Sequence, residues 1–250
     1  MIYYFSGTGN SKWIAEQLAL KTSDIAINLI DCSDVLSMDS QTIGLVFPVY
    51  AWGVPEVVAE FVKKLRDKPE FIFAVCSCGD EAGYALDKLN TIFPLNSKYS
   101  IAMPNNYVIG SDVDKDDVVA SKITKAKEKI EKIAAEVNKK QTVFDVKIGK
   151  LPWIKSNFIC YCFNKFARST KPFYITDKCI SCGQCAERCP SKAIKMIDGK
   201  PNYIKESCYM CTSCINRCPT KAIEYGKATN IRNRYQFKEF KKVRIRNEKL

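Results

Sequence analysis

The chain has 250 residues, of which 46% are hydrophobic, and it carries a formal net charge of +12. This length accommodates a domain of ordinary size together with a smaller one, and the apolar content argues against disorder. Because the chain has no histidine, imidazole is excluded from any acid–base or metal chemistry. No apolar run approaches the roughly 18 residues that a membrane-spanning helix needs, so we expect no transmembrane segment.

Thirteen cysteines would suggest disulfides in a secreted protein. The chain opens, however, with a strand-like apolar run at residues 2–5, and it shows no leader of charged, then apolar, then small residues. We therefore expect a reducing compartment, the cytoplasm, in which cysteines serve chemistry other than disulfide formation.

The first elements are a strand, a loop and a helix, since the apolar run is followed by an amphipathic stretch from Lys12 to about Leu20. Glycines let the intervening backbone turn tightly, and hydroxyls and amides at the start of a helix can surround a phosphate dianion. The segment has neither the dinucleotide-binding fingerprint nor the Gly-Lys-Ser/Thr of a P-loop. We interpret it as a phosphate loop made of Ser6, Gly7, Thr8, Gly9, Asn10 and Ser11.

Four further apolar runs follow, at residues 25–30, 43–47, 71–76 and 99–103. They alternate with helical patterns that start near Val54, Gly83 and Asp114. Five strands with interleaved helices predict an α/β fold with a doubly wound parallel sheet. In such a sheet the ligand lies at the carboxyl ends of the strands, near the point where the strand order reverses.

Residues 114–140 show the clearest helical pattern. Asp116 and Asp117 near the start, and Lys139 and Lys140 near the end, complement the helix dipole. We expect this helix to close the sheet, with lysines on a solvated face. Its apolar stripe consists of Val119, Ile123, Ala126, Ile130, Ile133 and Val137.

Two loops after the third and fourth strands are candidates for the rest of the ligand site. In the loop over residues 77–83, the candidate cofactor contacts are Cys78, Gly79 and Gly83. Alternatively, Cys78 is an incidental buried cysteine, and the aromatic residues of the other loop only pack that loop. That other loop is made of Pro48, Val49, Tyr50, Ala51, Trp52 and Gly53.

The phosphate loop resembles that of flavodoxins, Ser/Thr-x-Thr-Gly-x-Ser/Thr. Trp52-Gly53 resembles the flavodoxin pair in which the ring stacks on the flavin and the adjoining peptide turns over to accept a hydrogen bond from the flavin N5. The resemblance implies FMN as the cofactor and a flavodoxin-like domain over residues 1–140. It also implies a positive φ at Gly53, which glycine adopts without a side-chain penalty.

The segments after the fifth strand leave alternatives open. Asn105 and Asn106 bond either their own loop or the C-terminal half of the chain. The connector, residues 141–172, contains six aromatic residues and six Lys or Arg residues against one acidic residue, a density that is unusual for a free linker. We expect it to pack the two domains together; the alternatives are a segment on a membrane surface and an extra site that uses Cys160 and Cys162.

A segment of twelve residues then recurs at a spacing of 29. Residues 179–190 read Cys-Ile-Ser-Cys-Gly-Gln-Cys-Ala-Glu-Arg-Cys-Pro, and residues 208–219 read Cys-Tyr-Met-Cys-Thr-Ser-Cys-Ile-Asn-Arg-Cys-Pro. The match extends beyond the cysteines, which indicates a duplicated half-domain with a pseudo-twofold axis. Zinc is the alternative metal, but zinc sites separate two cysteine pairs by a longer loop and do not require a third thiol two residues on.

The repeat resembles the signature of two-cluster 4Fe-4S ferredoxins, and this resemblance assigns residues 173–226 to such a domain, which has a small α+β fold. In these proteins the fourth cysteine of each motif binds the cluster of the other motif. The resemblance therefore implies a first cluster held by Cys179, Cys182, Cys185 and Cys218. It implies a second cluster held by Cys208, Cys211, Cys214 and Cys189.

Residues 227–250 form a basic tail, in which nine Lys or Arg residues accompany Glu239 and Glu248. Such a tail binds nucleic acid, docks acidic partners or is simply solvated. Two clusters and a flavin phosphate, at about −2 each, still leave the molecule positive. We expect acidic redox partner proteins and no nucleic acid.

The chain as a whole resembles flavodoxin–ferredoxin fusion proteins, which occur mainly in anaerobes. The resemblance implies electron transfer between FMN and two 4Fe-4S clusters, with conversion of two-electron into one-electron flow for redox partners. The alternative is a flavin-dependent reductase that acts on a small molecule or on NAD(P)H at the FMN. The sequence offers no acid–base pair, no separate nucleotide motif and no catalytic residue for that reaction, which favours the carrier.

Overall fold

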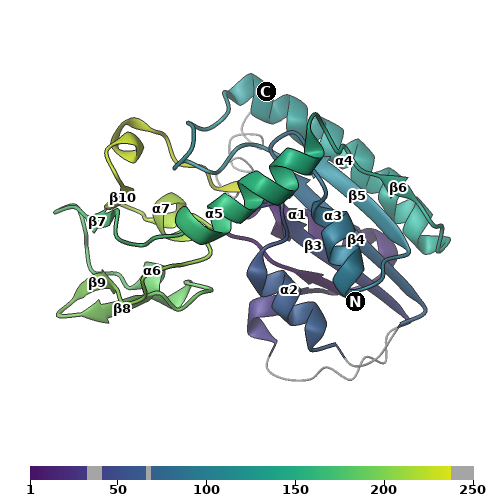
Figure 1. The fold of residues 1–250 in the computed structure, drawn as a ribbon, viewed down its shortest axis with the longest axis horizontal. Coiled ribbons are helices and arrows are strands. Elements are labelled where there is room, and N and C mark those ends of the chain that lie inside the picture. Colours follow the sequence, from purple (N-terminus) through teal and green to yellow (C-terminus); the bar gives the residue numbers. More distant parts are fainter. Residues whose placement is uncertain (33–40, 66–68, 238–250) are drawn as a thin grey trace, which may run out of the picture. The chain divides into compact units, whose positions relative to one another are not determined.

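The computed structural model describes residues 1–32, 41–65 and 69–237, which are coloured in Figure 1. The chain divides into two compact units. The first contains residues 1–6, 10–104 and 116–165, and the second contains residues 7–9, 105–115 and the chain from residue 166 onward. Within the three described ranges, no helix combines the length and the apolar character that crossing a membrane requires.

The first unit is built on a parallel sheet whose six described strands have the order β2-β1-β3-β4-β5-β6. The order reverses at β1, because the chain adds β2 on one side of it and β3 on the other. This confirms the predicted doubly wound α/β fold. The strands are β1 (Ile2–Tyr4), β2 (Ala26–Asn28), β3 (Thr42–Pro48), β4 (Phe71–Cys78), β5 (Ser97–Ala102) and β6 (Phe144–Asp145).

The middle of the sheet is buried on both faces. All eight residues of β4 are buried, and its sequence lacks the alternation of a strand with one solvated face. Five consecutive residues of β3 are buried in the same way. Parallel strands covered by helices on both sides require such continuous apolar runs. The strands were predicted from these runs.

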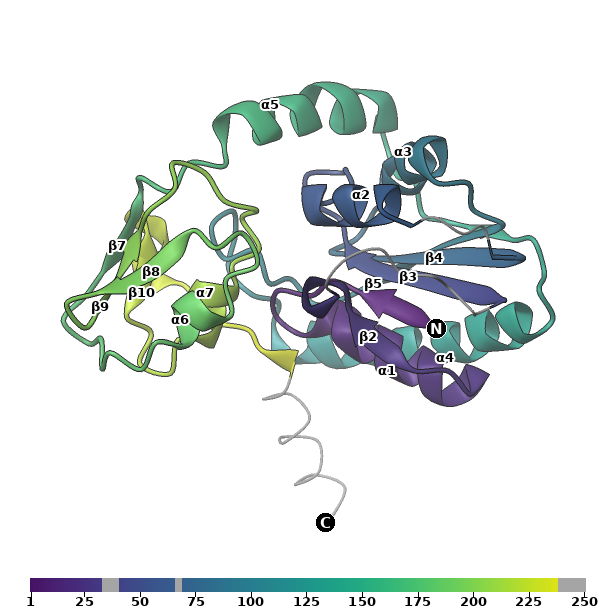
Figure 2. The ribbon, with the colours of Figure 1, turned by 90° about the horizontal axis from the view of Figure 1, so that it is seen from below.

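Helices cover the two faces in pairs, as Figure 2 shows: α2 (Glu56–Lys63) and α3 (Ala85–Ile92) lie on one face, and α1 (Asn10–Thr22) and α4 (Asp116–Asn138) lie on the other. Helix α4 confirms the predicted apolar stripe. Burying each large side chain of the stripe stabilises the fold by roughly 1.5–3 kcal/mol. The stripe residues, none more than 3% exposed, are Val119, Ile123, Ala126, Ile130, Ile133 and Val137.

The sequence predicted five strands, and the sixth comes from the connector. Strand β6 pairs in parallel with β5. Lys129 of α4 donates to the Asp145 carboxylate at 2.8 Å, which ties the helix to this strand. A strand of two residues is too short to produce the two-residue period by which strands are predicted, so the pattern could not reveal it.

The connector continues as one helical segment. A π-helical stretch, η2 (Ile154–Ile159), runs directly into α5 (Cys160–Phe166). We call residues 152–166 the connector helix. Up to Lys165 it belongs to the first unit, where it lies on the side of α2 and α3 in Figure 2. The predicted role of the connector in packing two domains together stays a prediction.

The described part of the second unit contains two small antiparallel sheets and two short helices. Strand β7 (Phe173–Ile175) pairs with β10 (Ile223–Tyr225), and β8 (Ile194–Ile197) pairs with β9 (Lys200–Tyr203). Helices α6 (Gln184–Glu187) and α7 (Ser213–Arg217) begin at equivalent places in the two cysteine motifs. This matches the predicted small α+β domain.

The first residues of the predicted basic tail are folded into the second unit. They form a short 3₁₀ turn, η3 (Ala228–Ile231), and then bury Tyr235 and Phe237 to 6% exposure each. Arg234 pairs with Glu224 at 2.7 Å, with both side chains buried. A count of charges treats such an arginine as solvated, whereas here it is paired inside the unit. Residues 238–250, and the predictions that fall on them, lie outside the described residues.

Candidate functional site

The phosphate loop leads from β1 into the first turn of α1. Gly9 has a φ of +115°, a conformation that a side chain would strain. Thr8 and Ser11 are 2% and 1% exposed, and Asn10 is also buried. Hydroxyls and backbone amides at the start of a thirteen-residue helix are the donors that a phosphate requires.

Hydrogen bonds join the predicted loops at one edge of the sheet. Pro48 ends β3, and the next amide, that of Val49, donates to the Ser77 carbonyl oxygen at 2.8 Å. The Ser77 hydroxyl lies 2.8 Å from the Ser11 hydroxyl in the phosphate loop. The carboxyl ends of β1, β3 and β4 therefore bring the predicted residues together at the point where the strand order reverses.

Three residues of the phosphate loop, Gly7–Gly9, belong to the second compact unit. A side-chain carbon on Gly7 would collide with the carbonyl oxygen of Cys211, in the second cysteine motif. The Arg217 guanidinium donates from Nε to the Gly7 carbonyl oxygen at 2.9 Å. The close approach of the second motif therefore requires glycine at position 7.

Asn106 connects the same loop to the second motif through its side chain and its backbone. Its Nδ2 donates to Thr8 Oγ1 at 2.5 Å. Its carbonyl oxygen accepts from Thr212 Oγ1 at 3.1 Å and from Asn216 Nδ2 at 3.0 Å. Asn105 instead donates to its own loop. Of the two alternatives that the sequence left open, Asn105 bonds its own loop, and Asn106 contacts the C-terminal half through its backbone carbonyl oxygen rather than through its side chain.

The loop after β3 forms a tight turn closed by Tyr50 and Gly53. The Tyr50 amide donates to the Gly53 carbonyl oxygen at 3.1 Å, and the Gly53 amide donates to the Tyr50 carbonyl oxygen at 2.9 Å. The expected positive φ at Gly53 is wrong, because the left-handed residues are Ala51 (φ 45°) and Trp52 (φ 58°). Glycine is required at position 53 for a different reason: a side-chain carbon would collide with Cys160 Sγ of the connector helix.

The loop after β4 lies against the same turn. Gly83 has a φ of 58°, and a side chain there would press on Trp52. The Lys155 ammonium lies 5.2 Å from the centre of the Trp52 ring. Cys78 is 6% exposed, and burial raises the pKa of its thiol to about 12. A side-chain carbon added at Gly79 would have no other atom within 4 Å. Contacts of these residues with a cofactor stay predictions.

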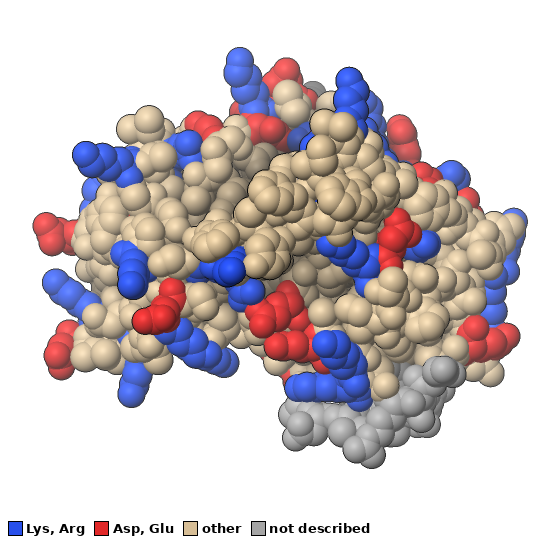
Figure 3. All heavy atoms as spheres, viewed as in Figure 1, with Lys and Arg blue, Asp and Glu red and all other residues tan. Residues whose placement is uncertain are grey.

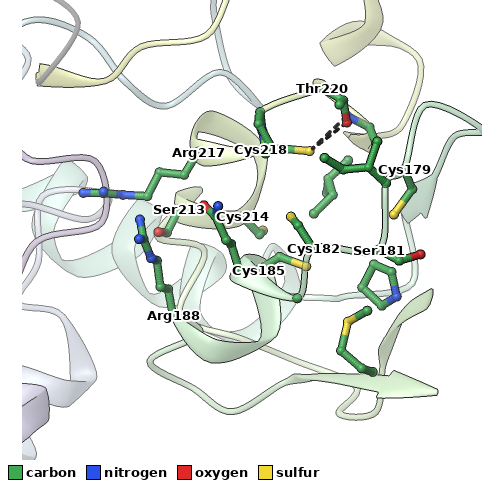
Figure 4. A pocket seen from close by; sticks show the side chains of 18 residues that line it. Cys179, Ser181, Cys182, Cys185, Arg188, Ser213, Cys214, Arg217, Cys218 and Thr220 are labelled. Carbon is green, nitrogen blue, oxygen red and sulfur yellow. Dashed lines mark hydrogen bonds between the residues drawn. The ribbon is translucent and has the colours of Figure 1, made fainter. Parts of the chain in front are cut away.

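One cavity of the second unit is lined by cysteines from both motifs. Cys179, Cys182 and Cys185 of the first motif face the same space as Cys218 of the second, and Figure 4 shows their sulfur atoms around it. Cys214 also reaches this cavity. The rest of the lining is largely apolar and includes Ile180, Met196, Pro201, Pro219, Ala222 and Ile223.

A second cavity gathers the remaining motif cysteines. Cys189 of the first motif lines it together with Cys208, Cys211 and Cys214 of the second, and Cys185 also reaches it. Each cavity is therefore lined by three cysteines of one motif, by the fourth cysteine of the other motif, and by one further cysteine of that other motif. Aromatic and apolar residues complete the second lining, among them Phe173, Pro190, Ile194, Tyr203 and Met210.

Comparison with protein families identifies both parts of the chain. The model of a flavodoxin domain matches residues 1–93, and the model of a 4Fe-4S dicluster domain matches residues 171–219. The chain is a fusion of a flavodoxin domain with a 4Fe-4S dicluster domain. Its cofactors are accordingly FMN and iron–sulfur clusters, as the sequence predicted. No curated protein matches the chain.

The two halves of the dicluster domain repeat their hydrogen bonds to sulfur. Cys189 Sγ accepts from the Ala193 amide at 3.3 Å, and Cys218 Sγ accepts from the Ala222 amide at 3.2 Å. These equivalent bonds support the duplication inferred from the sequence. Equivalent positions also share a positive φ, namely Ser181 and Met210, Gly183 and Thr212, and Lys192 and Lys221.

Thr212 stands where the first half of the dicluster domain has Gly183. A β-branched residue at a φ of 54° is strained, at a cost of order 1–3 kcal/mol. The Thr212 hydroxyl offsets this strain by donating to the Asn106 carbonyl oxygen and by accepting from Asn216 Nδ2 at 3.0 Å. The second motif therefore departs from the first at the position that contacts the phosphate-loop network.

The donor set in the cavities suits a metal cluster. Burial raises the pKa of the Cys211 thiol to about 12. The pKa of the Cys214 thiol is also raised, mainly by burial and secondly by the nearby Cys211 sulfur. Because cysteine binds metal as the thiolate, cationic iron bound here would keep such buried sulfurs deprotonated. Among the described residues, no three His, Cys, Asp or Glu side chains gather as one metal ion would need. Four thiols around a largely apolar cavity fit a cubane.

Tyr203 is a site residue that the sequence analysis missed. Its hydroxyl donates to Cys214 Sγ at 3.3 Å, and its ring stacks on Phe173 with the ring centres 4.4 Å apart. It lies between the two motifs, and nothing in their spacing singles it out. Arg217 was visible as a repeat of Arg188, but the repeat gave no sign of its bond to the phosphate loop.

Anaerobically isolated protein is expected to contain about eight iron atoms and one FMN per chain. The reason is that the chain has a flavodoxin domain and two cavities, each lined by three cysteines of one motif and the fourth cysteine of the other. Iron, acid-labile sulfide and flavin are measured on the same sample after anaerobic reconstitution. Stoichiometric zinc in place of iron would contradict the expectation.

Proposed function

We propose that the chain transfers electrons between FMN and two 4Fe-4S clusters and converts two-electron into one-electron flow for redox partner proteins. When bound, FMN supplies chemistry that accepts electrons in pairs and releases them singly, and each cubane exchanges one electron. The proposal places the first cluster on Cys179, Cys182, Cys185 and Cys218. It places the second cluster on Cys208, Cys211, Cys214 and Cys189.

The observation that carries the proposal is the contact between the phosphate loop and the second motif. Gly7 lies against the backbone of Cys211, a ligand of the second cluster in this assignment, and accepts from Arg217. Asn106 bridges Thr8 to Thr212. The backbone that would hold the flavin phosphate is thus packed directly on the backbone that would hold a cluster. This supports electron exchange within one chain.

The residues around this contact have separate tasks. Thr8 and Ser11 would orient the phosphate, because both hydroxyls lie in the loop at the helix start. Arg217 and Asn106 fix the loop against the second motif. Tyr203 stabilises negative charge on Cys214 through its hydroxyl hydrogen bond. Burial of Thr8 and Ser11 excludes water, which strengthens their polar interactions.

The charge of the chain bears on its partners. With 39 Lys or Arg residues against 27 Asp or Glu residues, the chain attracts acidic proteins over a long range at low salt. Increasing ionic strength to physiological values shortens that range to about 8 Å. We therefore propose that the redox partners are acidic proteins that dock by electrostatic attraction.

Photoreduced FMN is expected to bleach the cluster absorbance at a rate that does not change over a tenfold range of protein concentration. The physical reason is that donor and acceptor share one chain. NADH or NADPH alone should reduce the protein slowly, whereas a reduced ferredoxin should do so quickly and with strong salt dependence. Both reactions are followed anaerobically by stopped-flow absorbance.

A matched pair of variants provides the control for the first measurement. Asn106→Ala removes the bond to Thr8 and should slow the internal reaction, whereas Asn105→Ala removes only bonds within its own loop. A rate proportional to protein concentration would contradict electron exchange within the chain. Rapid, saturable reduction by either nicotinamide would make the flavin-dependent reductase the leading function.

A further inference from the structure

The connector helix buries small and polar side chains and exposes large apolar ones, which is the opposite of an ordinary surface helix. Between residues 151 and 166 the buried side chains are small: Ser156 is 0% exposed and Cys160 is 7% exposed. Ser156 Oγ accepts from the Tyr84 amide at 2.8 Å, and Cys160 Sγ lies against Gly53. The Lys155 ammonium pairs with Glu81. The inner side is therefore held by small and polar groups.

The outer side of the same helix is apolar. Trp153, Phe158 and Tyr161 are 66%, 63% and 57% exposed, and Ile154 is 43% exposed. Leu151, which directly precedes the helix, is 67% exposed. Figure 3 shows uncharged side chains, in tan, gathered over α5. A surface helix normally buries its large apolar residues and exposes its polar ones. An exposed, contiguous apolar surface of this kind marks an interaction site.

Lysines stand among the apolar side chains. Within residues 141–165 they are Lys147, Lys150, Lys155 and Lys165, of which Lys147 and Lys155 pair with Asp80 and Glu81. Lys165 lies 5.5 Å from the centre of the Tyr161 ring and donates to its hydroxyl at 3.1 Å. Trp, Tyr, Phe and Leu side chains beside lysines are the composition of helices that lie in the headgroup region of a bilayer.

We propose that the outer side of the connector helix binds the surface of an anionic lipid bilayer, with the helix axis in the plane of the membrane. The apolar side chains enter the boundary between headgroups and acyl chains, and the lysines meet the negative headgroups. A second copy of the chain fits this surface less well, because pairing two such helices would bring lysines against lysines. The inference does not depend on the proposed electron transfer.

Vesicle flotation tests the proposal on the full-length protein. Binding is expected to vesicles of phosphatidylcholine with about a quarter phosphatidylglycerol, and to be weaker on phosphatidylcholine alone and at 1 M salt. The double variant Trp153→Ser/Phe158→Ser should bind the anionic vesicles roughly tenfold more weakly or worse, because two aromatic side chains no longer enter the bilayer. Both positions are exposed, so far-UV circular dichroism should be unchanged.

The matched control replaces exposed apolar residues elsewhere in the first unit. Leu20 and Ile25 are 76% and 60% exposed, and Leu20→Ser/Ile25→Ser should leave vesicle binding as it is. Equal loss in both double variants, equal binding of the connector variant and the parent, or no binding to anionic vesicles would each overturn the proposal. Concentration-dependent dimerisation that the connector variant abolishes, without vesicle binding, would assign the surface to a second copy.

Discussion

Replacing Cys218 with serine is expected to remove the cluster of the first motif and to leave the cluster of the second. The reason is that Cys218 lines the cavity of Cys179, Cys182 and Cys185, although it lies more than thirty residues beyond them in sequence. Iron should fall from about eight to about four atoms per chain. Iron and sulfide analysis, with electron paramagnetic resonance of the reduced protein, checks both the loss and its location.

Comparison among cysteine variants gives the location without any assumption about which signal belongs to which cluster. Cys218→Ser should give the same spectrum as Cys179→Ser and a different one from Cys208→Ser, because Cys208 lines the other cavity. Cys162, which lines neither of the two cavities, supplies the control: Cys162→Ser should keep all the iron. A Cys218→Ser spectrum that matches Cys208→Ser would place both clusters within single motifs.

The chemistry of the two domains was readable from the sequence because it depends on short spacings. Two-residue gaps between cysteines, and a serine and threonine loop before a helix, are local patterns that the fold cannot rearrange. The central strands could also be predicted, because continuous apolar runs are typical of parallel strands that are buried on both faces. Strand β6 was not, because two residues carry no periodicity.

Glycine roles show where sequence reasoning stops. Gly53 was interpreted as a residue with positive φ, but the structure requires glycine there because Cys160 approaches it from the connector helix. Gly7 likewise accommodates Cys211, which lies about two hundred residues away in sequence. A sequence reports the conformations that a residue permits. It does not report which remote backbone comes close.

Charge was the other property that the sequence assigned imperfectly. Arg234 counts as part of a solvated basic tail until the structure pairs it with Glu224 in a buried site. Conversely, the aromatic residues of the connector were expected to be buried by packing between domains. Trp153 and Phe158 are exposed, however, while Ser156 is buried. Composition predicted that the connector is not a free linker. Only the structure shows which side of its helix faces outward.

Replacing Ser11 with glutamate is expected to abolish FMN retention, whereas glutamine at the same position should retain considerably more. Ser11 is 1% exposed in the first turn of α1, and no acidic residue occupies that turn. A carboxylate there meets the same helix N-terminus that would bind the phosphate, so the two negative groups compete for one set of amides. Flavin content after purification, and titration of the apoprotein with FMN, provide the measurement.

The pair of substitutions separates charge from size, because glutamate and glutamine fill nearly the same volume and both remove the hydrogen bond to Ser77. Two like charges about 4 Å apart at a protein surface repel by about 4 kcal/mol per charge pair, so FMN binding should be at least about a hundredfold weaker with glutamate than with glutamine. The helix itself should tolerate glutamate, since an acidic residue in a first turn is favourable by roughly 0.3–1 kcal/mol.

Iron content should stay at the parental value in both variants, because the cysteine cavities contain no phosphate-loop residue. Equal FMN affinity in the two variants would show that the phosphate binds elsewhere, and parallel loss of iron would show that the substitution had damaged the fold.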